Sequence, residues 1–379
     1  MRILISVSGF FPAQKYGGPA VSIRNMCNML CDKIDIFIVT VNHEFGIQDR
    51  LVGIKEGWNK YEGYSVLYLS EEEINKKCLD KIISEIKPDC IYVNSLFYYR
   101  FTVPLLKIAC KRNIALILAP RGEICKNSFR RKYKKIPYIW YLSKYFKKNN
   151  IYFEATAEDE KKQIEQYLLK NGKPVFLLPN VPSMGSLKPH IKQSKDYLSI
   201  IFLARIQRKK NLIGALQILK YVNIPVRFEI YGPKEVPEYW EKCQDVIGNL
   251  PKNVTVNYRG AISHDKVSDI MRKSDLYLFP TFSENYGHSI IEALQEGTPV
   301  LISDQTPWID LEEFGAGWAY PLEDKKRYAH SIEKVFHMEN DEYENMSNSA
   351  VNYVKAKFNM GKIKKLYIEM FSSTQHIKR

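Results

Sequence analysis

The sequence of 379 residues predicts an α/β protein built from two doubly wound domains. Three observations support this fold class. The chain is longer than one ordinary hydrophobic core accommodates. Short apolar runs, typical of buried parallel strands, alternate with segments whose apolar residues recur at helical spacing. This alternation stops at a stretch rich in proline and glycine and then begins again, which indicates a second domain.

The first half alternates strands and helices in a regular order. Strands are expected at residues 3–7, 34–40, 65–69, 90–93, 115–118, 151–155 and 175–178. Helices are expected at residues 21–30, 72–86, 103–111 and 158–169. Since helices join successive strands, the sheet should be mostly parallel. This first domain is expected to span residues 1–185.

The second half repeats the pattern after a predicted linker. Residues 179–185 read Pro-Asn-Val-Pro-Ser-Met-Gly, and a polar stretch continues to residue 196. Strands are expected at residues 198–203, 227–231, 254–258 and 276–279 and from residue 300. Helices are expected at residues 212–220, 238–248 and 265–272, from residue 288, and along an amphipathic tail from residue 341. The second domain is expected to span residues 196–357.

Composition limits the classes of protein to which this chain could belong. No apolar run reaches 18 residues, so a transmembrane helix is not expected. The apolar N-terminal stretch is too short for a signal peptide. Seven cysteines lie without metal-ligand spacing, as expected of a reduced cytosolic chain. The net charge of +14 is concentrated in residues 1–190, which hold 30 Lys or Arg against 18 Asp or Glu.

Much of this charge lies between Lys126 and Lys148, a stretch with nine basic residues and no acidic one. Aromatic and apolar residues are interleaved with the charges. Such a stretch could lie on an anionic membrane, or it could be a solvated helix with an aromatic side facing the core. Nucleic acid is the weakest alternative, because no recognised nucleic-acid-binding module accompanies the charge.

The most informative segment is residues 276–303. A buried strand enters a polar loop, and a helix begins near His288. Glu284 and Glu292 flank this turn with seven residues between them. Unpaired backbone N–H groups at a helix N-terminus attract anions, and carboxylates can accept hydrogen bonds from sugar hydroxyls. Together these groups indicate a nucleotide sugar as the ligand.

A second candidate site follows the first strand of the second domain. Arg205 and Lys210 bracket a short loop that leads into a helix. An arginine presents a planar fork to a phosphate, and a lysine adds a point charge. A basic loop without a ligand is the alternative reading.

The segment at residues 276–303 resembles the glutamate-x7-glutamate motif of retaining glycosyltransferases of family 4. The resemblance implies the GT-B fold, in which two Rossmann-like domains face each other across a cleft. It implies that Glu284 holds donor-sugar hydroxyls and that Glu292 holds the ribose. Arg205 and Lys210, matched to the family pattern G-R-x4-K, would neutralise the departing diphosphate, although Ala204 replaces the family glycine. The final helix, residues 358–379, would pack back on the first domain.

The resemblance also implies further donor-binding residues. The signature loop would contribute Asn285, Tyr286, Gly287, His288 and Ser289. The double glycine Gly17-Gly18 would face the diphosphate and acceptor, and the strand ends at Gly232 and Gly260 would bound the base pocket.

Arg121 stands in a region where many family members have a histidine. This departure suggests that Arg121 binds sugar, phosphate or acceptor; a salt bridge with Glu123 is the alternative.

The function implied is a retaining, metal-independent transfer from a nucleotide-diphosphate sugar, UDP or GDP, with no cofactor. No Asp-x-Asp motif and no His/Cys cluster occurs in the sequence. By family analogy the acceptor is a lipid-linked saccharide in bacterial surface polysaccharide synthesis (O-antigen, capsule or exopolysaccharide). The enzyme would be cytoplasmic, at the inner face of the membrane if the basic stretch binds lipid. The alternatives are a GT-B-fold sugar-nucleotide epimerase and a basic membrane- or nucleic-acid-binding protein with an inactive cleft.

Overall fold

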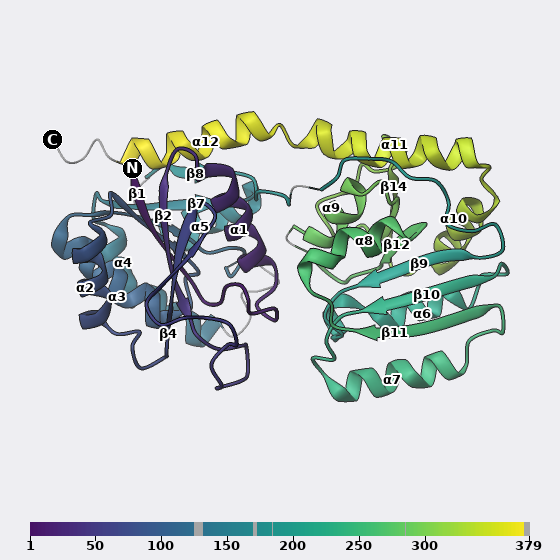
Figure 1. Cartoon of the computed structure of the whole chain (residues 1–379), viewed down its shortest axis with the longest axis horizontal. Helices are drawn as coiled ribbons and strands as arrows, with labels where there is room; N and C mark the ends of the chain where they lie inside the picture. The colour runs from purple at the N-terminus through teal and green to yellow at the C-terminus, as the bar shows by residue number, and fades with distance from the viewer. Residues whose placement is uncertain (125–131, 170–172, 184, 285, 375–379) are drawn as a thin grey trace. The chain divides into compact units, whose positions relative to one another are not determined.

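The computed structural model describes the chain except residues 125–131, 170–172, 184, 285 and 375–379, and it leaves out the side chains of residues 132–134. The chain divides into two compact units. Unit 1 comprises Met1–Val181 together with Met360–Arg379, and unit 2 comprises Pro182–Asn359. Each unit is an α/β structure with a mainly or wholly parallel sheet, which confirms the predicted fold class (Figure 1).

The sheet of unit 1 has eight strands in the order β3-β4-β2-β1-β5-β6-β7-β8. Only β3 runs antiparallel to its neighbour, β4. The strands are β1 (Arg2–Val7), β2 (Asp35–Val41), β3 (Trp58–Tyr61), β4 (Tyr64–Leu69), β5 (Cys90–Asn94), β6 (Ala115–Ala119), β7 (Ile151–Ala155) and β8 (Val175–Leu177). All except β3 were predicted. The four residues of β3 are mostly polar and half exposed, so they carry no apolar strand signal.

The helices of unit 1 cover its sheet. They are α1 (Gly18–Leu30), α2 (Lys76–Ile86), α3 (Tyr99–Arg112), α4 (Lys132–Phe146), α5 (Glu158–Tyr167) and α12 (Met360–Ser373). Buried side chains of α2, α3, α4 and α5 form one apolar cluster with the sheet. Helix α2 begins later than predicted because the Asn75 side chain caps it, accepting a hydrogen bond from the Cys78 N–H at 3.0 Å.

Helix α12 belongs to unit 1 although it lies near the other end of the chain. Lys364 pairs with Asp32 at 2.7 Å, just after α1. The Tyr367 hydroxyl donates to the Pro179 carbonyl at 3.2 Å, and the Phe371 ring lies 5.9 Å from the Tyr92 ring. The structure therefore places this helix on the first domain, where the resemblance implied it would pack.

The sheet of unit 2 has six parallel strands in the order β11-β10-β9-β12-β13-β14. They are β9 (Leu198–Leu203), β10 (Val226–Tyr231), β11 (Val254–Gly260), β12 (Leu276–Phe279), β13 (Val300–Ser303) and β14 (Gly317–Tyr320). Strand β14 was not predicted, because its four residues include a glycine and give no apolar run.

Helices flank this second sheet (Figure 1). They are α6 (Leu212–Leu219), α7 (Pro237–Gly248), α8 (Val267–Arg272), α9 (His288–Gln295), α10 (Lys325–His337) and α11 (Asn340–Lys357), with short 3-10 turns η1 (Arg208–Lys210) and η2 (His264–Lys266). Helix α11 contacts α9, and α6 contacts α7 and α10.

Of the predicted linker, residues 179–196, the described residues from Pro182 onward belong to unit 2. The Glu296 carboxylate accepts hydrogen bonds from the Ser186 N–H at 3.0 Å and its hydroxyl at 2.6 Å. Lys192 donates to two carbonyls at the end of α10, each at 2.7 Å. A side chain on Gly297 would lie 2.9 Å from the Lys188 carbonyl, so the two backbones pass closely. The boundary therefore falls at Val181, earlier than residue 185, and the polar stretch is ordered by partners far along the chain.

Asp275 fixes the start of β12 against this segment. Its carboxylate accepts the backbone N–H of Gln193 at 2.7 Å and of Ser199 at 2.8 Å. The side chain is buried, and burial raises the pKa of Asp275 from 3.8 to about 6 despite these two donors. The folded state therefore binds a proton more tightly than the unfolded state does.

This raised pKa predicts a pH-dependent stability. The stabilisation that comes from the protonated Asp275 side chain should be fully present below pH ~4. It should be lost as pH rises through about 6, because there the folded state must ionise a buried carboxyl. Relative to Asp275→Asn, the wild-type free energy of unfolding should fall by about 3 kcal/mol as pH rises from about 4 to about 7. Urea denaturation across this range measures it. Asp245→Asn, at an exposed position of α7, is the control; identical pH profiles for wild type and Asp275→Asn would refute the assignment.

Candidate functional site

The carboxyl edge of the unit 2 sheet brings the predicted site loops together. Strands β9 and β12 are parallel neighbours, so the loops that follow them leave the sheet side by side. The Lys209 carbonyl accepts hydrogen bonds from the Thr281 hydroxyl and the Phe282 N–H, both at 3.0 Å. The Asn211 side chain donates to the Pro280 carbonyl at 2.8 Å. These bonds hold the two loops as one surface.

Lys210 and Glu284 form an ion pair across this surface. Their side chains are only 18% and 11% exposed, so the pair is largely shielded from water. Lys210 ends η1, and Asn211 then adopts a left-handed backbone (φ 57°) and caps α6 through the Gly214 N–H at 3.1 Å. The Glu284 N–H donates to the Gln305 carbonyl at 3.0 Å. Two residues 74 positions apart are thus held in contact.

Helix α9 begins directly beyond this pair. Gly287 is its N-cap, with φ 77° and ψ 62°, a left-handed conformation that glycine adopts without strain. Among the residues that the structure describes, no side chain caps the first turn. The partial positive charge of the helix N-terminus is therefore presented by backbone N–H groups, as an anion site requires.

Tyr277 supports this helix start from beneath. Its hydroxyl donates to the Leu203 carbonyl at 3.1 Å and hydrogen-bonds the Ser289 hydroxyl at 2.8 Å. The side chain is fully buried, and burial together with the charges of Glu284 and Glu292 raises its pKa well above the ordinary value. Both predicted carboxylates therefore lie close to one phenol. Sequence reasoning missed Tyr277; the only signal was a tyrosine inside an otherwise apolar strand.

Glu292 has its own partner, His264, with Nε2 to Oε1 at 3.1 Å. The two side chains are 11% and 22% exposed. His264 begins η2, near the helix start expected there. Each signature glutamate thus lies beside a basic group, Glu284 beside Lys210 and Glu292 beside His264.

Arg205 pairs with a different carboxylate from the one that Lys210 contacts. Its guanidinium pairs with Glu235 at 3.1 Å, and the two side chains are 41% and 31% exposed. The strand ends around it are close-packed, because the Gly232 N–H donates to the Gly260 carbonyl at 2.8 Å. A side chain at Gly232 would lie 1.9 Å from the Ala204 carbonyl oxygen. The predicted base-pocket glycines are therefore adjacent and leave no room for a larger residue at 232.

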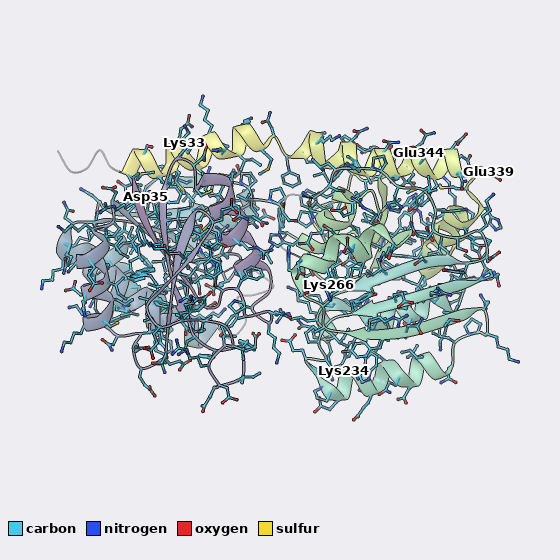
Figure 2. The ribbon with its side chains drawn as sticks, viewed as in Figure 1. Lys33, Asp35, Lys234, Lys266, Glu339 and Glu344 are labelled. Carbon is cyan, nitrogen blue, oxygen red and sulfur yellow. The ribbon has the colours of Figure 1, made fainter. Side chains whose placement is uncertain are left out.

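Two aromatic rings flank a lysine next to these strand ends. The Lys234 ammonium lies 4.5 Å from the ring centroids of both Trp240 and Tyr258; Figure 2 labels Lys234 at this end of unit 2. The Tyr258 hydroxyl donates to the Gly232 carbonyl at 2.9 Å. This group was not predicted from the sequence.

The rest of the signature loop is partly described. The Tyr286 carbonyl accepts the Trp308 indole N–H at 2.5 Å, and the Tyr286 ring lies 4.6 Å from the His288 ring. Asn285 lies outside the described residues. Ser289 is held by Tyr277, as described above.

In unit 1 the double glycine begins α1. Gly17 is the N-cap with φ 69°, and Gly18 is the first helical residue. The Glu44 carboxylate fixes the preceding loop by accepting the N–H groups of Gln14 at 2.8 Å and Lys15 at 3.0 Å. Whether Gly17 and Gly18 contact a donor stays a prediction.

Arg121 is buried in a network within unit 1. Its guanidinium pairs with Glu154 at 3.3 Å, with side-chain exposures of 8% and 0%. It also donates to Asn94 at 2.9 Å, to Asn180 at 2.7 Å and to the Tyr92 hydroxyl. Glu123 instead holds the loop after β5, so the alternative reading, a salt bridge between Arg121 and Glu123, is wrong. A substrate contact by Arg121 stays a prediction, and the structure gives this side chain an internal set of partners.

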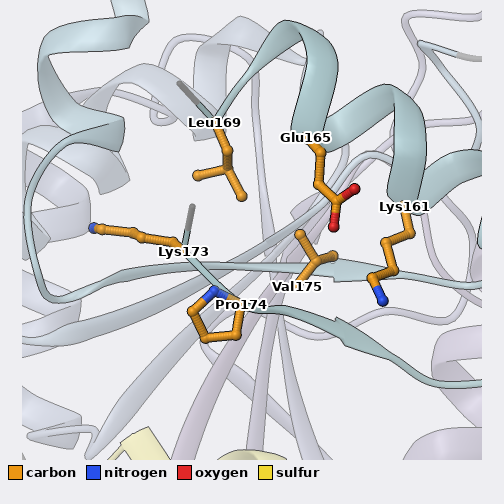
Figure 3. Close-up of a pocket in the computed structure, with 6 residues that line it drawn as sticks. All are labelled: Lys161, Glu165, Leu169, Lys173, Pro174 and Val175. Atoms are coloured by element: carbon orange, nitrogen blue, oxygen red, sulfur yellow. The ribbon is translucent and has the colours of Figure 1, made fainter. Parts of the chain in front are cut away.

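A hollow of about 350 Å³ lies elsewhere in unit 1, between the end of α5 and β8. Figure 3 shows Lys161 and Glu165 reaching from α5 toward Val175. None of the predicted site residues lines it. Among the described residues, no group of three or more His, Cys, Asp or Glu side chains could hold a metal ion.

Comparisons with known proteins show a family match within unit 2. Residues 186–353 match the family described as glycosyl transferases group 1. This match covers the signature residues, and the resemblance stated from them is confirmed.

Two characterised relatives match over a similar length. The gpi3 subunit of the Schizosaccharomyces pombe phosphatidylinositol N-acetylglucosaminyltransferase is 28% identical over 137 residues, 35% of this chain and 29% of that protein. The GtfA subunit of the Streptococcus agalactiae UDP-N-acetylglucosamine–peptide N-acetylglucosaminyltransferase is 28% identical over 142 residues, 37% of this chain and 26% of that protein. Each match thus spans less than a third of the relative's length.

Solved structures extend the likeness to both units. Anabaena HepE, in complex with UDP and glucose, has a TM-score of 0.72 at 14% identity and covers 98% of this chain and 100% of its own. Sucrose-phosphate synthase of Thermosynechococcus elongatus has a TM-score of 0.71 at 14% identity, covering 98% and 99%. At this identity the likeness concerns the fold, and it confirms the GT-B class.

The shielded Lys210–Glu284 pair predicts a measurable coupling. Lys210→Met or Glu284→Gln alone should lower the free energy of unfolding of unit 2 by about 1–3 kcal/mol, because each leaves a poorly hydrated group without its partner. The double variant should lose at least about 1 kcal/mol less than the sum of the two single losses. Urea denaturation of the wild type, the two single variants and the double variant completes this double-mutant cycle. Strictly additive losses in the free energy of unfolding would show that the pair is not formed.

Proposed function

We propose that this chain is a retaining, metal-independent glycosyltransferase that moves a sugar from a nucleotide-diphosphate donor to a saccharide acceptor. The observation that carries the proposal is the grouping of Lys210, Glu284 and Glu292 around the N-terminus of α9. A cation and a helix N-terminus suit a diphosphate, and two carboxylates suit sugar hydroxyls. The family of residues 186–353 supports the same activity.

In the proposed reaction the bond from the sugar C1 to the diphosphate oxygen breaks, and a bond from C1 to an acceptor oxygen forms on the same face. The acceptor proton passes to the departing phosphate oxygen, so no protein nucleophile is assigned. Lys210, Arg205 and the first turn of α9 would stabilise the negative charge that develops on the diphosphate. Glu284 would hold donor-sugar hydroxyls and Glu292 the ribose hydroxyls.

The ion pair gives Lys210 a further property. Glu284 and the loop bonds hold its ammonium group in place before any donor binds, so little side-chain entropy remains to be lost on binding. The same pair orients Glu284. A preorganised cation of this kind is what charge stabilisation in a transition state requires.

We propose UDP ahead of GDP as the nucleotide. Structures of Anabaena HepE contain UDP and UDP-glucose, and the Escherichia coli trehalose-6-phosphate protein contains UDP-2-fluoro glucose. The fold is shared with both.

We further propose that the acceptor is lipid-linked, in bacterial surface polysaccharide synthesis, and that α4 touches the cytoplasmic membrane surface. The exposed side of α4 carries Trp140, 77% exposed, with Ile136 at 47% and Tyr141 at 39%. Lys144, Lys147 and Lys148 are exposed beside them. Aromatic and apolar groups beside lysines suit an anionic bilayer interface. No described helix is long and apolar enough to span a membrane; residues 126–131 of the basic stretch lie outside the description.

Removing the cations should mainly reduce turnover. Lys210→Ala or Arg205→Ala should cost about 2–4 kcal/mol of transition-state stabilisation, the effect of losing one preorganised charge-stabilising group. Release of UDP from a panel of UDP-sugars measures kcat/KM. Arg208→Ala, an exposed neighbour in the same turn, is the control and should stay near wild type. Wild-type turnover in both site variants would contradict the proposed clamp, and a wild-type protein that turns over no nucleotide sugar would contradict the function.

Chelation should leave transfer intact, since side chains and a helix N-terminus supply the positive charge. The assay above, repeated in EDTA and then with added magnesium or manganese, measures this. Loss of activity in EDTA with recovery on adding metal would overturn metal independence.

The exposed side of α4 should bind anionic membranes. Wild-type protein should sediment with phosphatidylcholine–phosphatidylglycerol vesicles at low salt and less at high salt, because salt screens the lysines. Ile136→Ser with Trp140→Ser should release it, while Tyr221→Ser, at an exposed position of unit 2, should not. A wild-type protein that ignores these vesicles at low salt would favour the solvated-helix alternative.

A further inference from the structure

A polar cluster lies at the carboxyl edge of the unit 1 sheet, in a different unit from Lys210, Glu284 and Glu292. It consists of Tyr16, His43, Glu71, Tyr98 and Arg100, here called the tyrosine–glutamate cluster. Its members come from the loops after β1, β2 and β4 and from the start of α3. Ligands of doubly wound domains bind at this edge of the sheet, where the loops after parallel strands gather.

The loop that presents Tyr98 is held under strain. Ser95 has φ 138°, a backbone conformation that residues with a side chain rarely adopt. The Glu123 carboxylate holds this loop by accepting the Ser95 hydroxyl at 2.7 Å and the N–H groups of Leu96 at 2.6 Å and Phe97 at 3.2 Å. The Ser95 hydroxyl in turn accepts the Tyr98 N–H at 3.0 Å. Strain that the surroundings enforce in this way concentrates at functional sites.

The Tyr98 hydroxyl is the group left unmatched by this arrangement. It is buried and has no hydrogen-bond partner in the described part of the chain. The Ser6 hydroxyl, near the end of β1 at the same sheet edge, is likewise buried and unmatched there. A buried hydroxyl without a partner costs about 1–3 kcal/mol, so a native structure normally supplies one from a ligand or water.

Tyr16 is fixed beside Tyr98. Its ring fills the space over Gly9, where an added Cβ would lie 2.1 Å from the ring, and it contacts the Phe45 ring edge-on at 5.9 Å. Its hydroxyl donates to the His43 carbonyl at 3.3 Å. Burial raises the pKa of Tyr16, and the neighbouring Tyr98 phenol adds to the effect. The two phenols therefore lie close together on positioned side chains.

The charges of the cluster are balanced within it. Arg100 pairs with Glu71 at 2.9 Å and also donates to the Glu71 carbonyl at 3.1 Å. His43 Nε2 lies 3.7 Å from the Glu71 carboxylate, which is 46% exposed. A phosphate would meet the negative charges of Glu71 and nearby Glu44. Phenols and a carboxylate instead match the hydroxyls of a neutral sugar.

Exposed rings beside the cluster suit the apolar face of such a ring. Phe45 is 57% exposed and Tyr99 is 59% exposed. We propose that the tyrosine–glutamate cluster binds the neutral sugar ring of the acceptor, with Tyr98, Tyr16 and Glu71 hydrogen-bonding its hydroxyls. This inference rests on the proposed transferase function, and it adds which residues of unit 1 receive the acceptor and that the bound part is an uncharged saccharide.

The test separates saccharide binding from nucleotide binding. Saturation-transfer NMR of the full chain in the presence of UDP, with methyl glycosides of glucose, galactose, mannose and N-acetylglucosamine as probes, should show binding of at least one. Tyr98→Phe and Glu71→Gln should each weaken that binding by about fivefold or more, the effect of one lost hydrogen bond. Affinity for UDP, measured by calorimetry, should be unchanged.

Tyr152→Phe, on β7 away from the cluster, is the matched control and should bind as wild type does. An unchanged thermal unfolding midpoint shows that each variant is folded. Wild-type saccharide affinity in both cluster variants would overturn the inference, as would a wild-type protein that binds UDP and none of the glycosides. Failure of the wild-type protein to bind UDP would instead count against the proposed function.

Discussion

The candidate donor site depends on one buried phenol. Tyr277 lies in the centre of the unit 2 sheet, and its hydroxyl joins the end of β9 to the first turn of α9. The helix therefore begins at a fixed height above the sheet. The position of this first turn determines where the backbone turns at Gly287 and where the side chains of Glu284 and Glu292 lie. A fully buried hydroxyl with two partners is expensive to disturb, so the loop geometry is largely decided from inside the domain.

The other end of α9 is fixed by a buried carboxylate. Glu296 is 1% exposed and accepts hydrogen bonds from Ser186, Ser268 and Arg272. Burial alone would raise its pKa, but these donors outweigh burial and hold the pKa below its ordinary value. The segment after the domain boundary is thus attached to the helix that carries Glu292. Buried charge with complete hydrogen bonding specifies how these segments meet.

The sequence was informative where local pattern and chemistry agree. The strand, glycine turn and helix around Glu284 and Glu292 form a contiguous segment, so their arrangement could be predicted from periodicity and capping. The side chains that the site residues contact could not be predicted in this way. Lys210 contacts Glu284, Arg205 contacts Glu235 and Arg121 contacts Glu154, and each contact joins residues 30 or more positions apart. Such pairs depend on strand order, which a periodic pattern does not determine. Strands β3 and β14 were not predicted, because each is only four residues long and shows no regular alternation of apolar and polar residues.

Unit 1 is built from two separate segments of the chain, and this affects how the protein folds during synthesis. Unit 2 is one continuous segment, whereas unit 1 needs α12, which the ribosome delivers after all of unit 2. Until then Tyr92, Arg121 and Glu154 lack Tyr367 and Phe371, which complete their surroundings. The first domain synthesised is therefore the last one finished. During synthesis it carries a partly open polar core, which a chaperone would be suited to protect.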